Sequence, residues 1–413
     1  MESTDRILDA AVARFAEGGM RAVSIREVAR VAEIDPSAIQ YRFGTKANLW
    51  NAALERAVAR DLERLRACVA MLESRPGLTA DEKIALLRHH VGESLGTWRD
   101  VTITWHTLLI ESLRQHAPLP IVVEWFLRRG EAWVAIARQM GLASEQAGGT
   151  LLLAVSSAEL FLFGILGEFE RKLYCEDFLR FVFRRLERGQ LPVETGNWFS
   201  RWCTERTDAR FEPGQPDGDQ NGPVHALSEA VARLLLAHGA EGVTHRAIAS
   251  EASLSLAATT RHFANLQDLL RAGYDRIGVN MLRHLEAPER MPPFAAPEDM
   301  AQAVASVWLS EDAMYGRALT GLLDVHIAAA RDATLLPVAS AIIAKLTVLA
   351  TRYFADANTL GVRTPFEAHI HYALSQSSIL FAALQEVEPA TLIKQAADDI
   401  TLLSGQLFSP VRE

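Results

Sequence analysis

The sequence predicts an all-α protein made of two tandem copies of one helical unit. Apolar residues recur at helical spacing along most of the chain, and no stretch alternates apolar and polar residues long enough to predict a sheet. A pattern near the N-terminus also returns later, so that Phe43 aligns with Phe263 at an offset of 220. The 413 residues are too many for one ordinary core, and 49% hydrophobic residues are typical of a globular protein.

The first unit is organised around two short predicted helices between Ser24 and Leu49. Ser24 and Glu27 have the spacing of a capping box, which predicts that a helix begins there. Asp35 before Pro36 predicts the start of the next helix, since proline is tolerated at the first helical position. A preceding helix is expected over 4–17, and later helices over 46–72, 80–95, 102–115, 121–140, 144–168 and 176–189.

The second of these helices has an outward face suited to reading DNA. Ile39 and Phe43 are four residues apart and should face inward, which turns the polar side chains outward. Glutamine pairs with adenine edges, and hydroxyl and cationic groups bind phosphates. No carboxylate occurs from Pro36 to Leu54, although the net charge of the chain is −9. The alternative is a polar face that is merely solvated. The candidate DNA contacts are Arg26, Ser37, Gln40, Tyr41, Arg42, Thr45 and Lys46.

These segments resemble the N-terminal domain of TetR-type transcriptional regulators. The resemblance lies in ILDAAVARFAEGG at 7–19, SIREVAR at 24–30 and IQYRFGTKANL at 39–49. It implies a helix-turn-helix whose third helix reads double-stranded DNA, with Tyr41 and Lys46 at the phosphate backbone. It also implies pairing of two units through a four-helix bundle, and a helical domain that binds a small-molecule effector and releases a repressor from its operator.

Composition predicts a cytoplasmic protein. Residues 1–50 carry seven Arg and Lys against seven Asp and Glu, so this region is neutral within an acidic chain. The three cysteines are scattered, as is typical of reduced thiols. Acidic residues at Glu2 and Asp5 argue against a signal peptide, and the most apolar run, 151–166, is too short to span a membrane. We therefore expect no membrane partner.

The second unit begins after a stretch rich in Pro, Gly and acid at 204–223, which is typical of a linker. The offset of 220 also pairs Gly19 with Gly239, and Arg26 with Arg246. A pair of serines recurs near the end of each unit, at 156–157 and 377–378. The predicted domains are DNA-binding regions at 1–50 and 224–270, and helical ligand-binding and dimerisation regions at 51–203 and 271–413.

The second DNA-binding region departs from the first. Ala247 replaces the glutamate of the capping box, and Leu266 stands where the first region has Lys46. No acid occurs from Ala252 to Gln267, so DNA contact remains the expectation. The alternative is a degenerate copy kept for packing. The candidate contacts are Arg246, Thr260, Arg261, His262 and Asn265.

Two units on one chain suggest an intramolecular pseudo-dimer, joined through 147–189 and 365–407. Because the two reading helices differ, the expected operator is asymmetric or pseudo-palindromic. The competing arrangement pairs like halves of two chains in a further homodimer, which would carry four readers.

Aromatic and polar residues in the two helical domains are candidates for a ligand site, although such residues more commonly fill a core. The candidates are Trp98, Trp105, His106, Glu111, Trp125, Phe163, Trp308, His326, Tyr353, His369 and Tyr372.

Other classes of protein are less favoured. His369 and His371 are two apart on a predicted helix and would not share a metal ion. Glycine-rich phosphate loops, GxSxG and CxxC motifs are missing from the sequence, so neither an enzyme nor a cofactor is expected. The main alternative is a helical protein-protein adaptor that no longer binds DNA through one or both readers. The sequence leaves open whether a regulator of this kind represses or activates.

Overall fold

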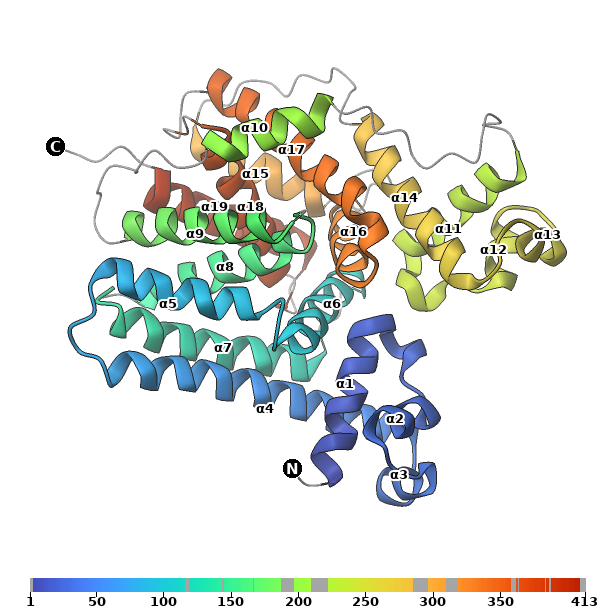
Figure 1. Ribbon diagram of the computed structural model, residues 1–413. Helices are drawn as coiled ribbons and strands as arrows, with labels where there is room; N and C mark the ends of the chain where they lie inside the picture. The colour runs from blue at the N-terminus through green and yellow to red at the C-terminus, as the bar shows by residue number, and fades with distance from the viewer. Residues whose placement is uncertain are drawn as a thin grey trace.

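The computed structural model describes residues 3–115, 119–142, 145–165, 167–186, 197–208, 222–284, 296–309, 318–357, 362, 364–382, 384–385 and 388–408 (Figure 1). Within these ranges every regular element is a helix. The helices of the first half are α1 (Ser3–Ala22), α2 (Ile25–Ala32), α3 (Pro36–Phe43), α4 (Lys46–Glu73), α5 (Ala80–Glu93), α6 (Arg99–Gln115), α7 (Pro120–Gln139), α8 (Glu145–Leu162), α9 (Glu168–Leu186) and α10 (Asn197–Asp208).

The second half contains nine further α-helices in its described residues. They are α11 (Pro223–Gly242), α12 (His245–Glu251), α13 (Leu256–His262), α14 (Leu266–His284), α15 (Pro297–Leu309), α16 (Ala318–Arg331), α17 (Leu336–Ala357), α18 (Pro365–Ala382) and α19 (Pro389–Phe408), with a 3₁₀ turn at Ala333–Leu335.

The first head, α1 to α3, is a small three-helix unit at one end of the molecule (Figure 1). Buried Ile7 and Phe15 on α1 pack with Ile39 of α3 and Leu49 at the start of α4. Helix α1 bends at Gly18 and Gly19, where Gly19 adopts φ 68° and ψ −163°, a conformation that side chains disfavour. Helix α4 then carries the chain from the head into the body of the protein.

Two helix boundaries in the body differ from the sequence expectation. A helix was expected over 144–168, but α8 ends at Leu162; another was expected over 176–189, but α9 already begins at Glu168. Glycines explain the early break, since Gly164 lies in the turn and Gly167 has φ 75°.

The second head, α11 to α13, repeats the order of helices seen in the first. Gly239 has φ 61° where the aligned Gly19 has φ 68°, and Ser253 and the aligned Glu33 both have φ 54°. The linker expected over 204–223 is shorter, because residues 204–208 form the end of α10 and α11 begins at Pro223. Residues 209–221 lie outside the described residues.

The two halves pack against each other through aligned helices: α1 on α11, α6 on α16 and α8 on α18. Helix α9 also contacts α19, and α10 crosses onto α17. The Oγ atoms of Ser157 and Ser377 are 2.7 Å apart, so the serines that meet have an offset of 220 rather than the 221 of the two serine pairs. The Arg331 guanidinium of α16 donates to the carbonyl of Ala16 in the first head at 2.8 Å.

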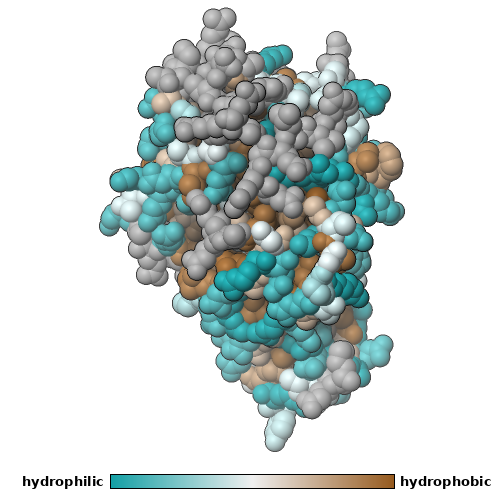
Figure 2. Space-filling view, turned by 90° about the vertical axis from the view of Figure 1, so that its left-hand side faces the viewer, coloured by the Kyte–Doolittle hydropathy of each residue, from teal (hydrophilic) through white to brown (hydrophobic). Residues whose placement is uncertain are grey.

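Among the residues that the structure describes, one stretch, Ala333–Arg352, is long and apolar enough to cross a membrane by length and composition. Its most apolar window is 56% buried inside the protein, where α10, α14 and α18 pack on α17. The face shown in Figure 2 is mostly hydrophilic in its lower part and narrows downward, toward the level at which Figure 1 places the first head.

Candidate nucleic-acid interface and a buried polar cluster

Capping side chains fix the two helices of the first head. Ser24 Oγ accepts a hydrogen bond from the Glu27 amide at 3.1 Å, whereas the Glu27 carboxylate accepts from the Arg30 guanidinium at 3.1 Å. Only the serine half of the expected capping box therefore appears among the described contacts. Asp35 accepts from the Ser37 hydroxyl and from its amide at 2.8 Å, and these bonds lower the pKa of Asp35.

All seven candidate contacts of the first head are exposed, and Tyr41 is 95% exposed. Several already bond within the head: the Gln40 amide donates to the Gly44 carbonyl, and Lys46 Nζ donates to the Met20 carbonyl at 2.6 Å. Thr45 caps α4 by accepting from the Asn48 amide at 3.1 Å. The polar ends of these side chains thus lie at the surface of one small unit.

The second head uses three different caps. Thr244 and Ser255 accept from backbone amides at 3.1 and 3.3 Å at the starts of α12 and α13. Asn265 Oδ1 accepts from the Asp268 amide at 2.9 Å, so its oxygen already serves as a helix cap. The predicted contacts Arg246, Thr260, Arg261, His262 and Asn265 are all exposed.

One exposed residue of the second head was not predicted. Leu256, the first residue of α13, is 55% exposed, and Ala257 beside it is exposed too. The sequence does indicate this exposure: Leu256 aligns with Pro36, which lies in the first turn of the first reading helix, and it directly follows the Ser255 cap.

The interior of the second head contains a polar pair where the first has two isoleucines. His245 and Thr259 align with Ile25 and Ile39, and His245 Nδ1 lies 3.2 Å from Thr259 Oγ1. The Thr259 hydroxyl donates to the Leu256 carbonyl at 2.8 Å, so it accepts from His245. This bond satisfies a hydroxyl that is fully buried.

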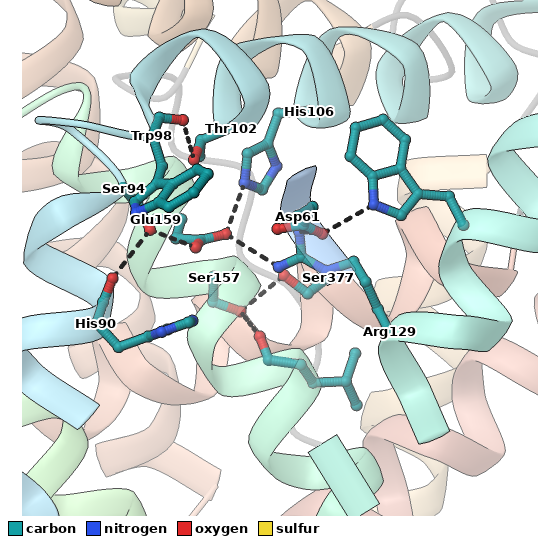
Figure 3. A network of polar contacts seen from close by, with 12 residues as sticks. Asp61, His90, Ser94, Trp98, Thr102, His106, Arg129, Ser157, Glu159 and Ser377 are labelled. Carbon is teal, nitrogen blue, oxygen red and sulfur yellow. Dashed lines mark hydrogen bonds and ion pairs between the residues drawn. The ribbon is translucent and has the colours of Figure 1, made fainter. Parts of the chain in front are cut away.

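A cluster of charged and polar side chains, here called the polar cluster, lies buried among α4, α5, α6, α7 and α8 (Figure 3). Sequence reasoning missed its four charged members. The sequence does contain one indication of this cluster. Asp61 lies four residues from both Ala57 and Leu65, so this acidic residue falls in the apolar stripe of α4. The members are Asp61, Arg64, His90, Ser94, His106, Trp125, Arg129 and Glu159.

Glu159 on α8 is at the centre of the polar cluster (Figure 3). It accepts from Ser94 Oγ at 2.6 Å, and its oxygens lie 3.4 Å from Arg129, 3.5 Å from Arg64 and 3.5 Å from His106 Nε2. Burial alone would raise the pKa of Glu159, but the charge of Arg129, the His106 hydrogen bond and the Arg64 charge outweigh it and lower that pKa. Glu159 is therefore ionised.

Asp61 is the second carboxylate of the polar cluster. Its carboxylate accepts from Arg64 at 3.0 Å, from Arg129 at 3.0 Å and from Trp125 Nε1 at 2.8 Å. Two carboxylates thus face two guanidinium groups. Burial lowers the pKa of His106, so this imidazole is neutral at pH 7.

The structure brings only some of the candidate ligand residues together. Trp105, His106 and Trp125 lie in or against the polar cluster, and Trp98 lies beneath the Arg64 guanidinium at 5.8 Å. Glu111 instead pairs with Arg114, which also binds Asp324 of the second half. The remaining described candidates contact neighbouring rings or, in one case, an amide: Phe163 with His106, His326 with Phe161, His369 with Tyr174, and Tyr372 with Gln376.

Two candidate ligand residues, Trp308 and Tyr353, have side chains that lie outside what the structure describes. A separate surface hollow of about 330 Å³ opens between α4 and α7, with none of the candidates in its lining. Its lining residues are Leu62, Arg66, Val69, Ala70, Glu73, Arg128, Glu131, Ala132 and Ala135.

Buried histidines characterise the helical domain of the second half. His369 Nε2 lies 2.9 Å from the Tyr174 hydroxyl, and His371 Nε2 lies 2.7 Å from Ser404 Oγ, so the two rings have separate partners. Burial lowers the pKa of His326 to about 4, and those of His369 and His371 to about 3. Among the residues that the structure describes, no group of three side chains has the arrangement of a metal site.

Comparison with protein families gives a match to the N-terminal region of the chain. Residues 7–53, which cover most of the first head and the start of α4, match the family of bacterial regulatory proteins, tetR family. No curated protein matches the chain. The family match supports a TetR-type, DNA-binding transcriptional regulator with an N-terminal helix-turn-helix.

Proposed function

We propose that the chain is a tandem duplication of a TetR-type unit, and that its two heads bind one DNA duplex as an intramolecular pseudo-dimer. The observation that carries this proposal is the pairing of aligned helices across the two halves: α1 with α11, α6 with α16 and α8 with α18. In a two-fold symmetric dimer the same surface meets itself, so equivalent residues meet near the axis. The contact between Ser157 and Ser377, at the offset of 220, fits that rule.

A second contact between aligned residues supports the same arrangement. The backbone amide of Arg21 donates to Glu241 Oε1 at 3.2 Å, and its guanidinium donates to the Glu241 carbonyl at 2.6 Å. These positions also differ by 220, and each follows the bend of its own first helix. The two heads therefore touch at equivalent points.

Unequal heads imply unequal half-sites. The first reading helix presents Gln40, Tyr41 and Arg42, whereas the second presents Thr260, Arg261 and His262 at the aligned positions. Selection of bound fragments from random duplex DNA should therefore recover two different half-sites in fixed order. Recovery of a perfect palindrome would contradict a single-chain reader and would favour two chains that pair like halves.

Sedimentation of the protein without DNA tests the pseudo-dimer directly. The expected particle has the mass of one chain, 45.5 kDa. A stable particle of two chains would overturn the single-chain arrangement while leaving DNA binding intact, because four readers would then be present.

DNA binding itself is tested by gel shift at several salt concentrations. Binding should weaken steeply with salt, because phosphate contacts release counterions. The double substitution Gln40→Ala with Tyr41→Ala should abolish the shift, whereas Arg138→Ala, at an exposed position on α7, should leave it unchanged. If the protein binds other proteins but gives no salt-dependent gel shift, the helical adaptor is the better explanation.

Regulation in this proposal is repression that a small molecule relieves. A ligand that binds the DNA-incompetent spacing of the heads more tightly shifts the population off the operator, and a difference of about 1 to 3 kcal/mol suffices. Failure of every tested compound to release the operator would contradict it. The proposal includes no catalytic step, no cofactor and no membrane, and places the protein in the cytoplasm.

A further inference from the structure

The two reading helices differ most in the chemistry of their first turn. The first begins with Pro36 and Ser37, which are both exposed. The second begins with Leu256, 55% exposed, followed by exposed Ala257. A single exposed leucine is common on protein surfaces. This one, however, lies on a helix whose outward face otherwise carries the exposed polar side chains Thr260, Arg261 and His262.

The two reading helices do not differ in free hydroxyl hydrogens. The Thr260 hydroxyl donates to the Ala257 carbonyl at 3.2 Å, and the Ser37 hydroxyl of the first head donates to Asp35. Leucine and alanine side chains have neither donors nor acceptors. The second reading helix therefore presents hydrocarbon in its first turn, whereas the first presents a hydroxyl, and Gln40 one turn later adds an amide.

Hydrocarbon in the first turn of a reading helix has one partner in the major groove. Residues near the N-terminus of such a helix face the base edges. Among the four bases, only thymine presents a methyl group there, and apolar side chains contact it. Cationic side chains such as Arg246 and Arg261 supply phosphate contacts, which position the helix without reading sequence.

We propose that the second head reads thymine through its C5-methyl group, by contact with Leu256, whereas the first head reads its half-site by hydrogen bonds. This inference rests on the proposed function, in which both heads lie on the same duplex. Leu256 is the residue that determines specificity in the second half-site.

Replacement of thymine by deoxyuridine tests the proposal, because it removes the methyl group and keeps base pairing. Duplexes from the selection experiment are made with deoxyuridine in one half-site or in the other. Burial of one methyl group contributes about 0.8 kcal/mol, so each contacted thymine should change the affinity about fourfold. One half-site should lose affinity to this degree on replacement, and Leu256→Ser should bind both versions of that half-site equally.

Ser250→Ala, at an exposed position on α12 of the same head that is not a candidate contact, is the control and should leave the deoxyuridine effect unchanged. Leu256 is exposed, so Leu256→Ser should fold, which a thermal melt checks. Insensitivity of both half-sites to deoxyuridine, or an effect that survives in Leu256→Ser, would overturn this inference while DNA binding stands. Absence of binding to any duplex would overturn the proposed function instead.

Discussion

The helical domain of the first half contains ionised groups in its core, whereas the two positions aligned with its buried carboxylates are apolar in the second half. Glu159 aligns with Ile379, which is fully buried, and Asp61 aligns with Met281, which packs on the second core. His106 and the aligned His326 are buried in both halves. Similar helix arrangements thus accept either kind of core. A buried ion pair is often no more stabilising than hydrocarbon of similar shape, but removal of one partner is severe.

The two halves also differ in how the core connects to the head. Asp61 and Arg64 lie on α4, the helix that begins beside the first reading helix. Glu159 lies on α8, two residues from Ser157, which contacts Ser377 of the other half. The polar cluster therefore joins the helix that carries the first head to the contact between the halves. In the second half α14 packs on α16 and α17, and Arg271 of α14 donates to Asp332, just after α16, at 2.7 Å.

Glu159→Ala should have the largest effect. It leaves the Arg64 and Arg129 guanidinium groups with one carboxylate between them in a buried site, which costs about 3 to 5 kcal/mol. Urea unfolding followed by tryptophan fluorescence measures the loss, because Trp105 and Trp125 adjoin the polar cluster.

Glu168→Ala, at an exposed position on α9, is the control and should leave the midpoint unchanged. Ile379→Ala removes the aligned hydrocarbon and should cost about 2 to 5 kcal/mol through the cavity it leaves. A loss below about 1 kcal/mol in Glu159→Ala would show that the charges of the first core are replaceable, and the contrast between the halves would then have no energetic meaning.

Acid should destabilise the second half through its histidines. The pKa of His371 is about 3 in the folded protein and near 6.5 when exposed, so the unfolded chain takes up a proton first as the pH falls. Stability is therefore complete above pH 6.5 and is lost toward pH 3. The loss between pH 6.5 and 4.5 is about 2 to 3 kcal/mol for one such histidine.

His371→Gln should flatten this part of the dependence of unfolding free energy on pH, because glutamine does not titrate. Exposed His89→Gln is the matched control and should keep the slope of the unmodified protein. The lowered pKa of Glu159 adds a separate loss in the first half below pH 4.5. An unchanged slope in His371→Gln would mean that this imidazole is not the group that resists protonation.

The sequence predicted those parts of the fold that local patterns determine. Caps at Ser24, Asp35 and Thr45 are local signals, and each accepts the backbone hydrogen bond expected of it. The polar cluster was not predicted, because its partners come from five helices and no spacing along the chain relates Asp61 to Glu159. Leu256 was overlooked for a different reason: its exposure depends on how α13 sits on its head, and a leucine in a helix is ordinarily assigned to the core.

The smallest expected effect concerns the interiors of the two heads. If the polar pair of the second head is only an alternative way to fill the space, His245→Ile together with Thr259→Ile should be neutral or stabilise that head by about 1 kcal/mol. Replacing both hydrogen-bonded partners by apolar groups is nearly neutral, whereas His245→Ile alone removes one bond worth about 1 kcal/mol. Hydrogen exchange of the α12 and α13 amides measures this locally, with the α2 and α3 amides as the internal reference. A double variant that loses more than about 2 kcal/mol would mean that the second head requires the His245 to Thr259 bond for its shape, and that the two heads reach the same arrangement of helices by different interactions.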